Sequence, residues 1–375
     1  MNGIHIREVR VHLVNITRKT ELLPKTSHGS ALSNDYVVIE VETNDGVVGV
    51  GEVTCAVGWN GEEAIGSVDL LRRKIVPSII GLSVDDWDGI FKSMEQWVRH
   101  RPFLKAGIEM ACLDAEGKTK GTSVADILGG ALRKDFRTKL VLPARETEVV
   151  RGMAKIALER GGTSFKVKVG LDIVADRERL SAVREVIGDH SLLVDANEGW
   201  RPEQEDDVLK LISDFNIVAI EQPYPRHMAK ESARLQAATP ALLMADESVW
   251  TSHDVARIAE EASFKVVSLY PGKQGGIRAC LAAAKLATKL GLEVSLGSNL
   301  ETGIGSAAMA HFLALVPVLC PTVPSDLLGP LYFEEDLVLD SSWIKWTGAS
   351  LPTGPGLGIE IDNSAVKAHE FSVTI

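Results

Sequence analysis

The chain has 375 residues, 45% of them hydrophobic and 24% charged, with a formal net charge of −11 at pH 7. This length predicts two domains or one large domain with an attachment, and the acidic balance argues against nucleic-acid binding. No run of about 18 apolar residues could span a membrane, and residues 1–21 lack the apolar stretch of a signal peptide. The four cysteines show neither zinc nor disulfide spacing. We expect a cytoplasmic protein without nucleic-acid or membrane partners.

The first third of the chain has the pattern of an α+β unit. Strands are expected at residues 6–14, 36–43 and 46–52, and Asn44-Asp45-Gly46 is a hairpin turn sequence. Residues 18–33 and 54–61 are expected to be loops, because both contain glycine and residues 18–33 lack apolar periodicity. Three helical patterns follow at about 61–78, 84–98 and 103–118.

From about Lys139 onward, short apolar strands alternate with amphipathic helices, which predicts parallel strand pairing. Eight strands are expected, at residues 140–143, 164–169, 192–195, 218–221, 242–246, 266–270, 293–297 and, more weakly, 324–327. Five successive strand ends, from Val169 to Tyr270, recur every 24 to 26 residues. This regularity favours a (β/α) barrel over an open sheet, and no G-x-G-x-x-G sequence follows the first strand as a dinucleotide-binding fold would require.

Three carboxylates occupy the same place in three consecutive repeats. Asp195, Glu221 and Asp246 each end an apolar run, which places them at the carboxyl ends of neighbouring strands, where barrel enzymes have their active sites. Converging anions repel one another unless a cation lies between them, and an all-oxygen set favours Mg²⁺ first and Mn²⁺ second. Each acid alone could simply cap the helix after its strand, but three acids in register favour a metal site.

The strand before these carboxylates carries two lysines. In Phe165-Lys166-Val167-Lys168-Val169 the two-residue period puts both lysines on one face. In a barrel the apolar face packs on the helices, so the lysines face the interior or its mouth. A buried ammonium without a partner has a lowered pKa, which makes it a usable base near neutral pH. The alternative is an exposed edge strand with one charged face.

Together these residues suit removal of the proton α to a carboxylate. Proton removal adds a second negative charge to the substrate, and a cation and a lysine near its oxygens stabilise the enediolate as that charge develops. No obvious nucleophile or oxidising cofactor site accompanies these residues. We therefore expect Mg²⁺-dependent chemistry on a small-molecule carboxylate.

On these motifs the chain resembles the enolase superfamily, in its muconate-lactonizing (muconate cycloisomerase) subgroup, over essentially its whole length. The motifs are Lys166-x-Lys168, Asp195-Ala-Asn, Glu221-Gln-Pro, Asp246-Glu-Ser, Gly275-Gly276, Gly297-Ser-Asn-Leu-Glu301-Thr-Gly-Ile-Gly and Gly354-Pro-Gly-Leu-Gly-Ile-Glu. Enolase-superfamily sites use a lysine or histidine base with one or two Mg²⁺ ions.

The resemblance implies a fold and a set of roles. The fold would be a modified TIM barrel of the (β/α)7β type at residues 126–345, with an α+β capping domain at 1–125 that residues 346–375 complete. Lys168 would be the acid/base and Lys166 its partner that steadies the enolate. The Mg²⁺ ligands would be Asp195, Glu221 and Asp246. The loops at 18–33 and 54–61 would close over the substrate, and the chain would form a homo-oligomer, with an octamer as one form.

One position departs from the subgroup. Members that use lysines on both faces of the substrate have a second lysine before the double glycine, and aligning Lys273-Gln-Gly-Gly puts Tyr270 there. A phenol with a pKa near 10 is a poor base at neutral pH but can donate a proton. Racemisation needs a base on each face, whereas cycloisomerisation or syn β-elimination needs only Lys168. The alternative is that Tyr270 is a packed aromatic without a chemical role.

Several other residues are weaker candidates for contacts around the site. Asn197 could hold a metal ligand in place, while Glu247 and Glu301 could bond lysines or substrate, or form structural ion pairs. Lys273 matches a different lysine of the subgroup. Lys25, His28 and Trp59 lie in the two loops and are candidates for substrate selection, although loop residues of this kind are often merely solvated. His311 follows an apolar helical run and is expected to be a satisfied core histidine.

The sequence thus predicts an isomerase (cycloisomerase) or lyase (dehydratase). Its cofactor would be Mg²⁺, with Mn²⁺ as an alternative, and its substrate a small carboxylic acid. Two alternatives stay open: a racemase or epimerase that uses Lys168 and Tyr270 on an amino-acid-type or hydroxy-acid substrate, and a non-catalytic metal-binding barrel that binds a ligand. The sequence does not identify the substrate.

Overall fold

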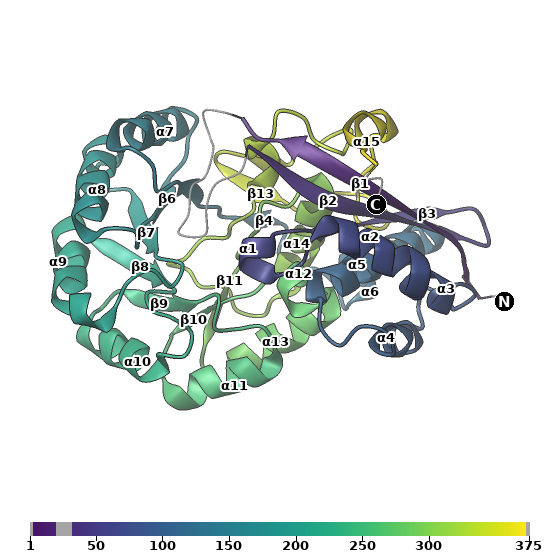
Figure 1. Cartoon of the computed structure of the whole chain (residues 1–375), viewed down its shortest axis with the longest axis horizontal. Coiled ribbons are helices and arrows are strands. Elements are labelled where there is room, and N and C mark those ends of the chain that lie inside the picture. The colour runs from purple at the N-terminus through teal and green to yellow at the C-terminus, as the bar shows by residue number, and fades with distance from the viewer. Residues whose placement is uncertain (1–2, 20–31, 373–375) are drawn as a thin grey trace.

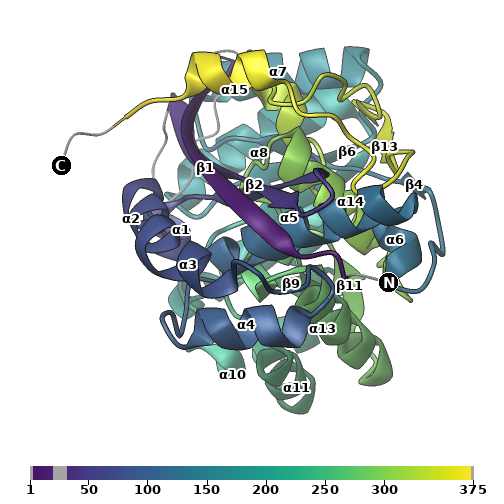
Figure 2. The same cartoon turned by 90° about the vertical axis from the view of Figure 1, so that its right-hand side faces the viewer.

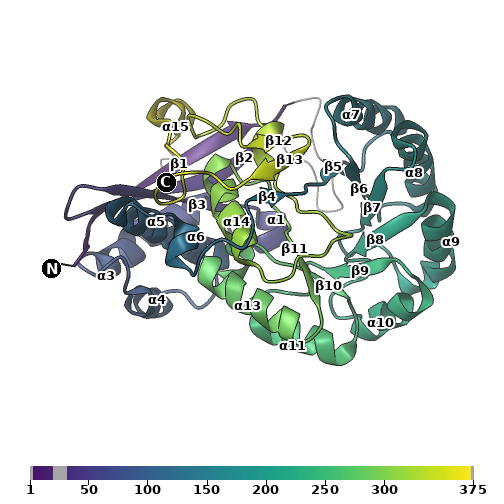
Figure 3. The ribbon, with the colours of Figure 1, turned by 180° about the vertical axis from the view of Figure 1, so that it is seen from behind.

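The computed structural model describes residues 3–19 and 32–372, which form two packed parts (Figure 1). One part is an antiparallel sheet with helices from the first third of the chain, and the other is a curled parallel sheet with helices on its outer side. Figure 3 shows the same two parts from behind. In the described ranges no helix is both long and apolar enough to cross a membrane.

The antiparallel sheet consists of β1 (Ile6–Thr17), β2 (Ser33–Thr43) and β3 (Val48–Thr54), paired in chain order. The turn between β2 and β3 lies at the predicted Asn44–Gly46, where Gly46 has φ +85° and donates its N–H to the Thr43 carbonyl at 2.9 Å. Left-handed backbone of this kind favours glycine. The hairpin prediction is therefore confirmed.

Helix α5 (Pro102–Lys120) packs on β3 unusually closely. A Cβ on Gly49 would lie 2.1 Å from the Ala111 carbonyl oxygen, and one on Gly51 would lie 2.0 Å from the Gly107 carbonyl oxygen. Only glycine fits such an approach of two backbones. The sheet and α5 thus form a rigid base for the cap.

The remaining helices of this part are short. They are α1 (Val57–Asn60), α2 (Ala64–Leu70), the π-helical η2 (Leu71–Ile75), α3 (Val76–Ile79), α4 (Trp87–Glu95) and α6 (Val124–Ile127). The prediction that residues 54–61 are loop throughout is wrong at α1, which ends at Gly61 with φ +73°. Four residues are too few to show a helical period in the sequence.

Seven parallel strands form the curled sheet, and their order in space follows the chain. They are β5 (Leu140–Leu142), β6 (Ser164–Lys168), β7 (Ser191–Asp195), β8 (Ile217–Glu221), β9 (Leu242–Ala245), β10 (Val266–Ser268) and β11 (Glu293–Ser295). Successive strands are joined by helices, as the alternating pattern predicts.

The connecting helices pack around the outside of the sheet, with α7 to α11 forming an outer arc (Figure 1). They are α7 (Thr147–Glu159), α8 (Ile173–Ile187), η3 (Pro202–Gln204), α9 (Glu205–Phe215), α10 (Ala229–Ala238), α11 (Ser252–Glu261), α12 (Pro271–Gln274), α13 (Ile277–Lys289), α14 (Gly303–Leu315) and η4 (Gly329–Tyr332). This arrangement confirms the predicted barrel with an N-terminal cap.

The gap between β11 and β5 is closed by an irregular segment. Ser325 donates to the Arg137 carbonyl and accepts from the Lys139 N–H, each at 3.0 Å, while Asp326 donates to the Leu296 carbonyl at 3.0 Å. The expected eighth strand at 324–327 is thus wrong as a regular strand, since it makes a single bridge to Thr138. Pro324 has no N–H to extend a ladder.

The last part of the chain returns to the first. Strands β12 (Ile344–Lys345) and β13 (Gly348–Ser350) form a small sheet with β4 (Asp135–Phe136). Helix α15 (Asn363–His369) then lies against β1 (Figure 2), and the Phe371 N–H donates to the Leu13 carbonyl at 3.0 Å.

Two buried carboxylates of the cap lie at the beginnings of barrel helices. Glu52 of β3 accepts from the N–H groups of Thr302 and Gly305 at the start of α14. Glu109 of α5 accepts from the N–H of Ile277 at the start of α13. Burial raises the pKa of both carboxyls to about 7. Helix N-termini attract such groups because their N–H groups lack partners and carry partial positive charge.

His311 links three segments of the chain. Its side chain is fully buried in α14, its Nδ1 accepts from the Ala125 N–H, and its Nε2 donates to the Leu357 carbonyl, each at 3.1 Å. Both ring nitrogens are therefore satisfied by a neutral imidazole, and burial lowers the pKa to about 4. The expectation of a satisfied core histidine is confirmed.

This histidine predicts a specific acid sensitivity. The unfolded chain binds a proton near pH 6.5 and the folded chain only near pH 4, so the stabilisation is complete above 6.5 and lost as the pH falls towards 4. The loss reaches on the order of 3 kcal/mol. In urea unfolding at a series of pH values, His311→Gln should show a flatter decline of unfolding free energy than the wild type. The exposed His253→Gln should keep the wild-type slope, and parallel curves for all three proteins would contradict the prediction.

Candidate active site

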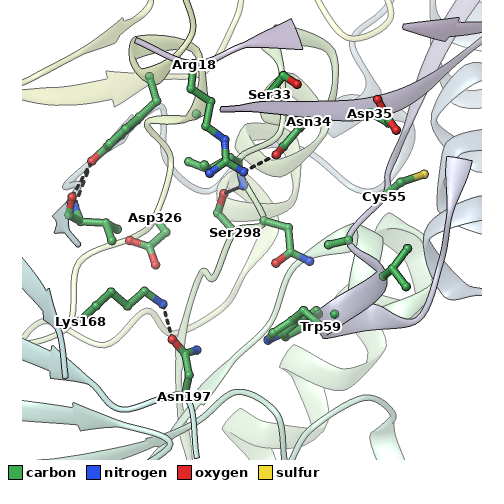
Figure 4. Close-up of a pocket in the computed structure, with 18 of the residues that line it drawn as sticks. Arg18, Ser33, Asn34, Asp35, Cys55, Trp59, Lys168, Asn197, Ser298 and Asp326 are labelled. Atoms are coloured by element: carbon green, nitrogen blue, oxygen red, sulfur yellow. Dashed lines mark hydrogen bonds between the residues drawn. The ribbon is translucent and has the colours of Figure 1, made fainter. Parts of the chain in front are cut away.

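A cavity of about 610 Å³ lies at the carboxyl ends of the barrel strands, beneath the cap (Figure 4). Its barrel side includes Lys166, Lys168, Asp195, Glu221 and Asp246. Its cap side comes from the end of β1, the start of β2 and the segment around α1. Cavities of this size accommodate small organic ligands.

Strand register brings the predicted residues together. Lys168 pairs with Asp195 across β6 and β7, Asp195 pairs with Glu221 across β7 and β8, and Glu221 pairs with Met244 of β9. Asp246 therefore follows two residues beyond that pairing. The parallel ladder sets all four side chains at one edge of the sheet, because neighbouring parallel strands end at the same level.

Gln222 fixes the position of Asp246. Its side-chain oxygen accepts from the N–H groups of Asp246 and Ser248 at 3.1 and 3.2 Å, and its amide nitrogen donates to the Tyr224 carbonyl and the Ser248 hydroxyl. Its φ of +36° turns the chain immediately after Glu221. One buried amide thus connects the ends of β8 and β9.

The two lysines of β6 point into the cavity and both are paired. Lys166 Nζ donates to Glu221 Oε2 at 2.7 Å and to Asp326 Oδ2 at 2.5 Å, and it lies 3.5 Å from Asp195. Lys168 Nζ donates to Asp195 Oδ2 at 2.5 Å and to Asn197 Oδ1 at 2.8 Å. The edge-strand alternative is wrong, because β6 lies between β5 and β7.

The expected lowered pKa is wrong for Lys166. Burial acts to lower the pKa of this ammonium, but the charges of Asp326, Glu221 and Asp195 outweigh burial and raise it well above its usual value. The expectation assumed an ammonium without partners, and the structure supplies three. Lys166 is held as a cation, which suits electrostatic stabilisation better than proton abstraction.

Two of the three predicted carboxylates have pKa values shifted in opposite directions. Burial, then the charges of Asp195 and Asp246, raise the pKa of Glu221 to about 7 against the opposing effect of Lys166. Burial also acts to raise the pKa of Asp195, but Lys168 and Lys166 outweigh it and lower the value. At Glu221, burial and the charges of the neighbouring carboxylates thus outweigh the opposing charge of Lys166.

The chemistry of these carboxylates fits a hard divalent cation. Within residues 3–19 and 32–372 no three His, Cys, Asp or Glu side chains form a ready-made metal cluster, and each carboxylate instead contacts a lysine. Yet all three are buried oxygen donors at adjacent strand ends. A cation would relieve the repulsion from Asp195 and Asp246, which after burial contributes to the raised pKa of Glu221. The donor set is suitable for Mg²⁺ or Mn²⁺.

A second group of residues surrounds the carboxylates and contacts them or one another. Lys273, fully buried, donates to Asp246 Oδ1 at 2.6 Å and to its carbonyl at 2.8 Å. Glu247 accepts from Asn197 at 3.0 Å and from the Trp59 indole at 3.2 Å. Burial, then the charge of Asp246, raise the pKa of Glu247 to about 8. Trp59, the candidate from the cap, thus lines the cavity and contacts the barrel.

Tyr270 does not line the cavity. Its ring is buried against Trp59 and Phe103, with ring centroids 6.1 Å away in both cases, and Lys273 Nζ lies 4.8 Å from its centroid. Burial, followed by the charges of Asp246 and other nearby carboxylates, raises the pKa of the phenol well above 10. Tyr270 thus packs beside the carboxylate cluster and is not part of the cavity wall.

The other candidates fall outside the cavity or the described residues. Glu301 accepts from the Ser298 hydroxyl at 2.5 Å and from the Asn299 N–H, and so shapes the turn after β11 that lines the cavity. Lys25 and His28 lie outside the described residues.

Two cavity residues were missed by the sequence analysis. Asp326 lies near the end of the weak eighth segment at residues 324–327. Only the poor strand pattern concealed its correspondence with the three other carboxylates. Lys139 precedes β5, yet its Nζ reaches the Pro324 carbonyl at 2.7 Å and lies 3.5 Å from Asp326. A lysine at the start of a strand can reach the far end only because its side chain is long, and no sequence pattern indicates this.

The charges of the whole cluster nearly balance. The cluster has a formal charge of −1, which a bound divalent cation would change to +1. The members are the carboxylates Asp195, Glu221, Asp246, Glu247 and Asp326 and the lysines Lys139, Lys166, Lys168 and Lys273. A cation-bearing site would therefore attract an anionic ligand.

Comparison with known protein families supports the fold and the site described above. Residues 7–129 match the N-terminal domain of the mandelate racemase / muconate lactonizing enzyme family, and residues 148–365 match the family described as enolase C-terminal domain-like. The chain therefore belongs to the mandelate racemase / muconate lactonizing enzyme family of the enolase superfamily, as the sequence motifs predict.

Relatives include enzymes of two reaction types. Muconate cycloisomerase 1 of Pseudomonas putida is 32% identical over 335 residues, covering 87% of this chain and 88% of that protein. The N-succinyl-L-Arg/Lys racemase of Bacillus cereus is 30% identical over 372 residues, covering 98% and 97%. The structure of a Pseudomonas fluorescens muconate lactonizing enzyme complexed with muconolactone superposes with a TM-score of 0.93 at 28% identity, covering 99% of this chain and 100% of that one. These relatives are cycloisomerases and racemases.

Proposed function

We propose that this protein removes the proton α to the carboxylate of a small acid, with Lys168 as the base, and completes a cycloisomerisation or a β-elimination of water. The observation that supports this most strongly is that Lys166, Lys168 and the three strand-end carboxylates line one cavity. The family's chemistry, together with this set of side chains, favours an enediolate-forming reaction over nucleophilic or redox catalysis.

Lys168 is the better placed of the two lysines to act as the base. It is the more exposed to the cavity, at 13% against 3% for Lys166. Asn197 and Asp195 hold its ammonium from one side, which orients the nitrogen. Lys166, surrounded by carboxylates, keeps its proton and would stabilise negative charge on the substrate oxygens.

Asp195, Glu221 and Asp246 would hold the divalent ion, Mg²⁺ or Mn²⁺. When bound, the ion would supply positive charge that lowers the free energy of the substrate after it has lost its α-proton. Lys273 and Gln222 hold Asp246, and Lys168 and the Asn197 N–H hold Asp195, so this chain's own residues fix the ligand positions.

A one-base reaction is favoured because, within residues 3–19 and 32–372, no lysine or histidine lines the cavity besides Lys139, Lys166 and Lys168. The position that would supply a second base carries Tyr270, whose phenol lies outside the cavity lining, and Lys273 is fully buried against Asp246. The racemase or epimerase reaction remains the second candidate, since a racemase is 30% identical over nearly the whole chain.

The first prediction from the proposed function concerns Lys168. Lys168→Ala should reduce exchange of the substrate α-hydrogen with solvent deuterium by at least about 100-fold, because general-base catalysis contributes that much or more. Exchange would be followed by NMR in D₂O with Mg²⁺, over a library of muconates, acid sugars and amino-acid derivatives. The exposed Lys155→Ala is the matched control. Unchanged exchange in a folded Lys168→Ala would reject the role, and binding without turnover by the wild type would favour the non-catalytic alternative.

The second prediction separates the two reaction types. Tyr270→Phe removes only the phenol oxygen, so it should leave the exchange rate close to that of the wild type if one base suffices. The measurement is α-hydrogen exchange from each enantiomer of a turned-over acid. Comparable exchange from both enantiomers, lost from one of them in Tyr270→Phe, would instead establish the racemase reaction.

The third prediction concerns the metal ligands. Mg²⁺ at 100 times its Kd should add about 2.7 kcal/mol to the stability of the wild type, seen as a rise of the melting temperature in a Mg²⁺ titration. Glu221→Gln should show a much smaller Mg²⁺-dependent rise, because it removes one anionic ligand. The exposed Glu260→Gln should respond like the wild type. Equal rises in Glu221→Gln and the wild type would exclude Glu221 as a ligand.

A further inference from the structure

Lys139 is a buried lysine at the cavity that the proposed chemistry does not use. It precedes β5, its side chain is fully buried, and it belongs to the residues that line the cavity. Its Nζ donates to the Pro324 carbonyl at 2.7 Å and to the Leu296 carbonyl at 3.4 Å, and it lies 3.5 Å from Asp326 Oδ2. Burial lowers the pKa of this lysine, and the charge of Asp326 opposes that effect. Three oxygen acceptors match the three N–H bonds of an ammonium, whereas a neutral amine has only two, so the surroundings fit the charged form.

Asp326 is shared by two lysines. Its Oδ2 accepts from Lys166 Nζ at 2.5 Å and lies 3.5 Å from Lys139 Nζ. Burial lowers the pKa of Lys166, and Asp326 is the largest of the charges that raise it. Two ammonium groups and one carboxylate give the triad Lys139–Asp326–Lys166 a net charge of +1. Without Lys139, the remaining pair would be neutral.

The net charge of the triad matters because of the task that Lys166 has in the proposed function. Its other carboxylate neighbours, Asp195 and Glu221, are assigned there to the divalent ion, so Asp326 is the counter-ion that Lys166 keeps. An ammonium paired with a carboxylate acts on a third group mainly as a dipole, whose effect decreases faster with distance than that of a net charge. Lys139 therefore restores a positive charge at this edge of the cavity.

A competing explanation is that Lys139 only ties the barrel together. Its bonds to the Leu296 and Pro324 carbonyls join the end of β11 to the irregular segment that stands in place of a regular eighth strand. The two explanations depend on different properties of the same ammonium. A tie between segments needs hydrogen-bond donors, whereas an electrostatic role needs the positive charge and the carboxylate that it offsets.

We propose that Lys139 is a positioning residue that acts through Asp326: its charge offsets that carboxylate, so that Lys166 presents a net positive charge to the substrate as the α-proton is removed. This inference rests on the proposed function, which gives Lys166 the task of stabilising negative charge on the substrate oxygens. The effect is large in a buried site because water screens these charges poorly there.

A charge-compensating pair of substitutions tests the proposal. Lys139→Met should lower kcat for α-hydrogen exchange about 10- to 100-fold and leave KM little changed, because the added negative charge appears only after the substrate has bound. The double variant Lys139→Met/Asp326→Asn removes the carboxylate as well and should recover most of the lost rate. Exchange is followed by NMR in D₂O with Mg²⁺, on the acid of the substrate library that the wild type exchanges fastest. A double variant no faster than Lys139→Met would overturn the proposal.

Two further variants separate the charge from the tie. Lys139→Gln keeps a hydrogen-bond donor without the charge, so it should slow exchange as Lys139→Met does, and it replaces Lys139→Met if that variant fails to fold. Lys105→Met removes another buried ammonium, which pairs with Glu95 outside the cavity lining, and should exchange like the wild type. Melting curves verify folding. Wild-type exchange in a folded Lys139→Gln would assign Lys139 to the tie alone.

A measurement without substrate tests the charge pair itself. Urea midpoints are compared for the wild type, Lys139→Met, Asp326→Asn and the double variant at pH 7. If Lys139 offsets Asp326, Lys139→Met should lower the midpoint less in the Asp326→Asn background than in the wild type, because the ammonium has lost its counter-ion there. Equal decreases in both backgrounds would show that the two charges are not coupled, which would also overturn the proposal.

The two proposals can fail separately. Coupling of Lys139 to Asp326 in the urea experiment, without α-hydrogen exchange in any acid, would support the charge pair and reject the proposed reaction. Exchange that depends on Lys168 but is unaffected by folded Lys139→Met and Lys139→Gln would support the reaction and reject the role of Lys139.

Discussion

The repulsion among carboxylates at the ends of β7, β8 and β9 is the constraint on which the rest of this site depends. Buried anions at adjacent strand ends are unstable unless cations lie between them. The structure meets this condition with lysines from three different places: β6, the residue before β5, and α12. Lys166, bonded to Glu221 and Asp326, is at the centre of this network. A divalent ion would relieve this repulsion further, since burial and the neighbouring carboxylates outweigh Lys166 at Glu221.

The barrel and the cap contribute different things to the cavity. The barrel supplies charged groups whose positions follow from strand register, so their spacing is as rigid as the sheet. The cap supplies a mixed wall in which Trp59 is joined to the barrel by Glu247, and Arg18 faces the cavity from the end of β1. A ligand in the cavity would therefore contact residues of both the barrel and the cap.

Much of this could be predicted from the sequence, because periodic features are local. The regular repeat of strands predicts the barrel. The two-residue spacing of Lys166 and Lys168, together with the acids that follow successive strands, predicts that the site lies at the carboxyl ends of those strands. Features that depend on folded distance could not be predicted. Lys139 reaches the site only through a long side chain. Asp326, one of the partners that raise the pKa of Lys166, lies 160 residues further along the chain in an irregular segment. The sequence identifies Tyr270 as the residue at the position of the second lysine. Only the structure shows that its ring packs beside that of Trp59.

The carboxylates of Glu52 and Glu109, seated on the first turns of α14 and α13, have a consequence for how such a protein can diversify. They fasten the cap to the barrel at points away from the cavity wall. Substitutions on the cap side of that wall can therefore alter which molecule the cavity accepts without removing the contacts that Glu52 and Glu109 make with the barrel. The residues that shape the cavity and the residues that join the cap to the barrel can thus change independently during evolution.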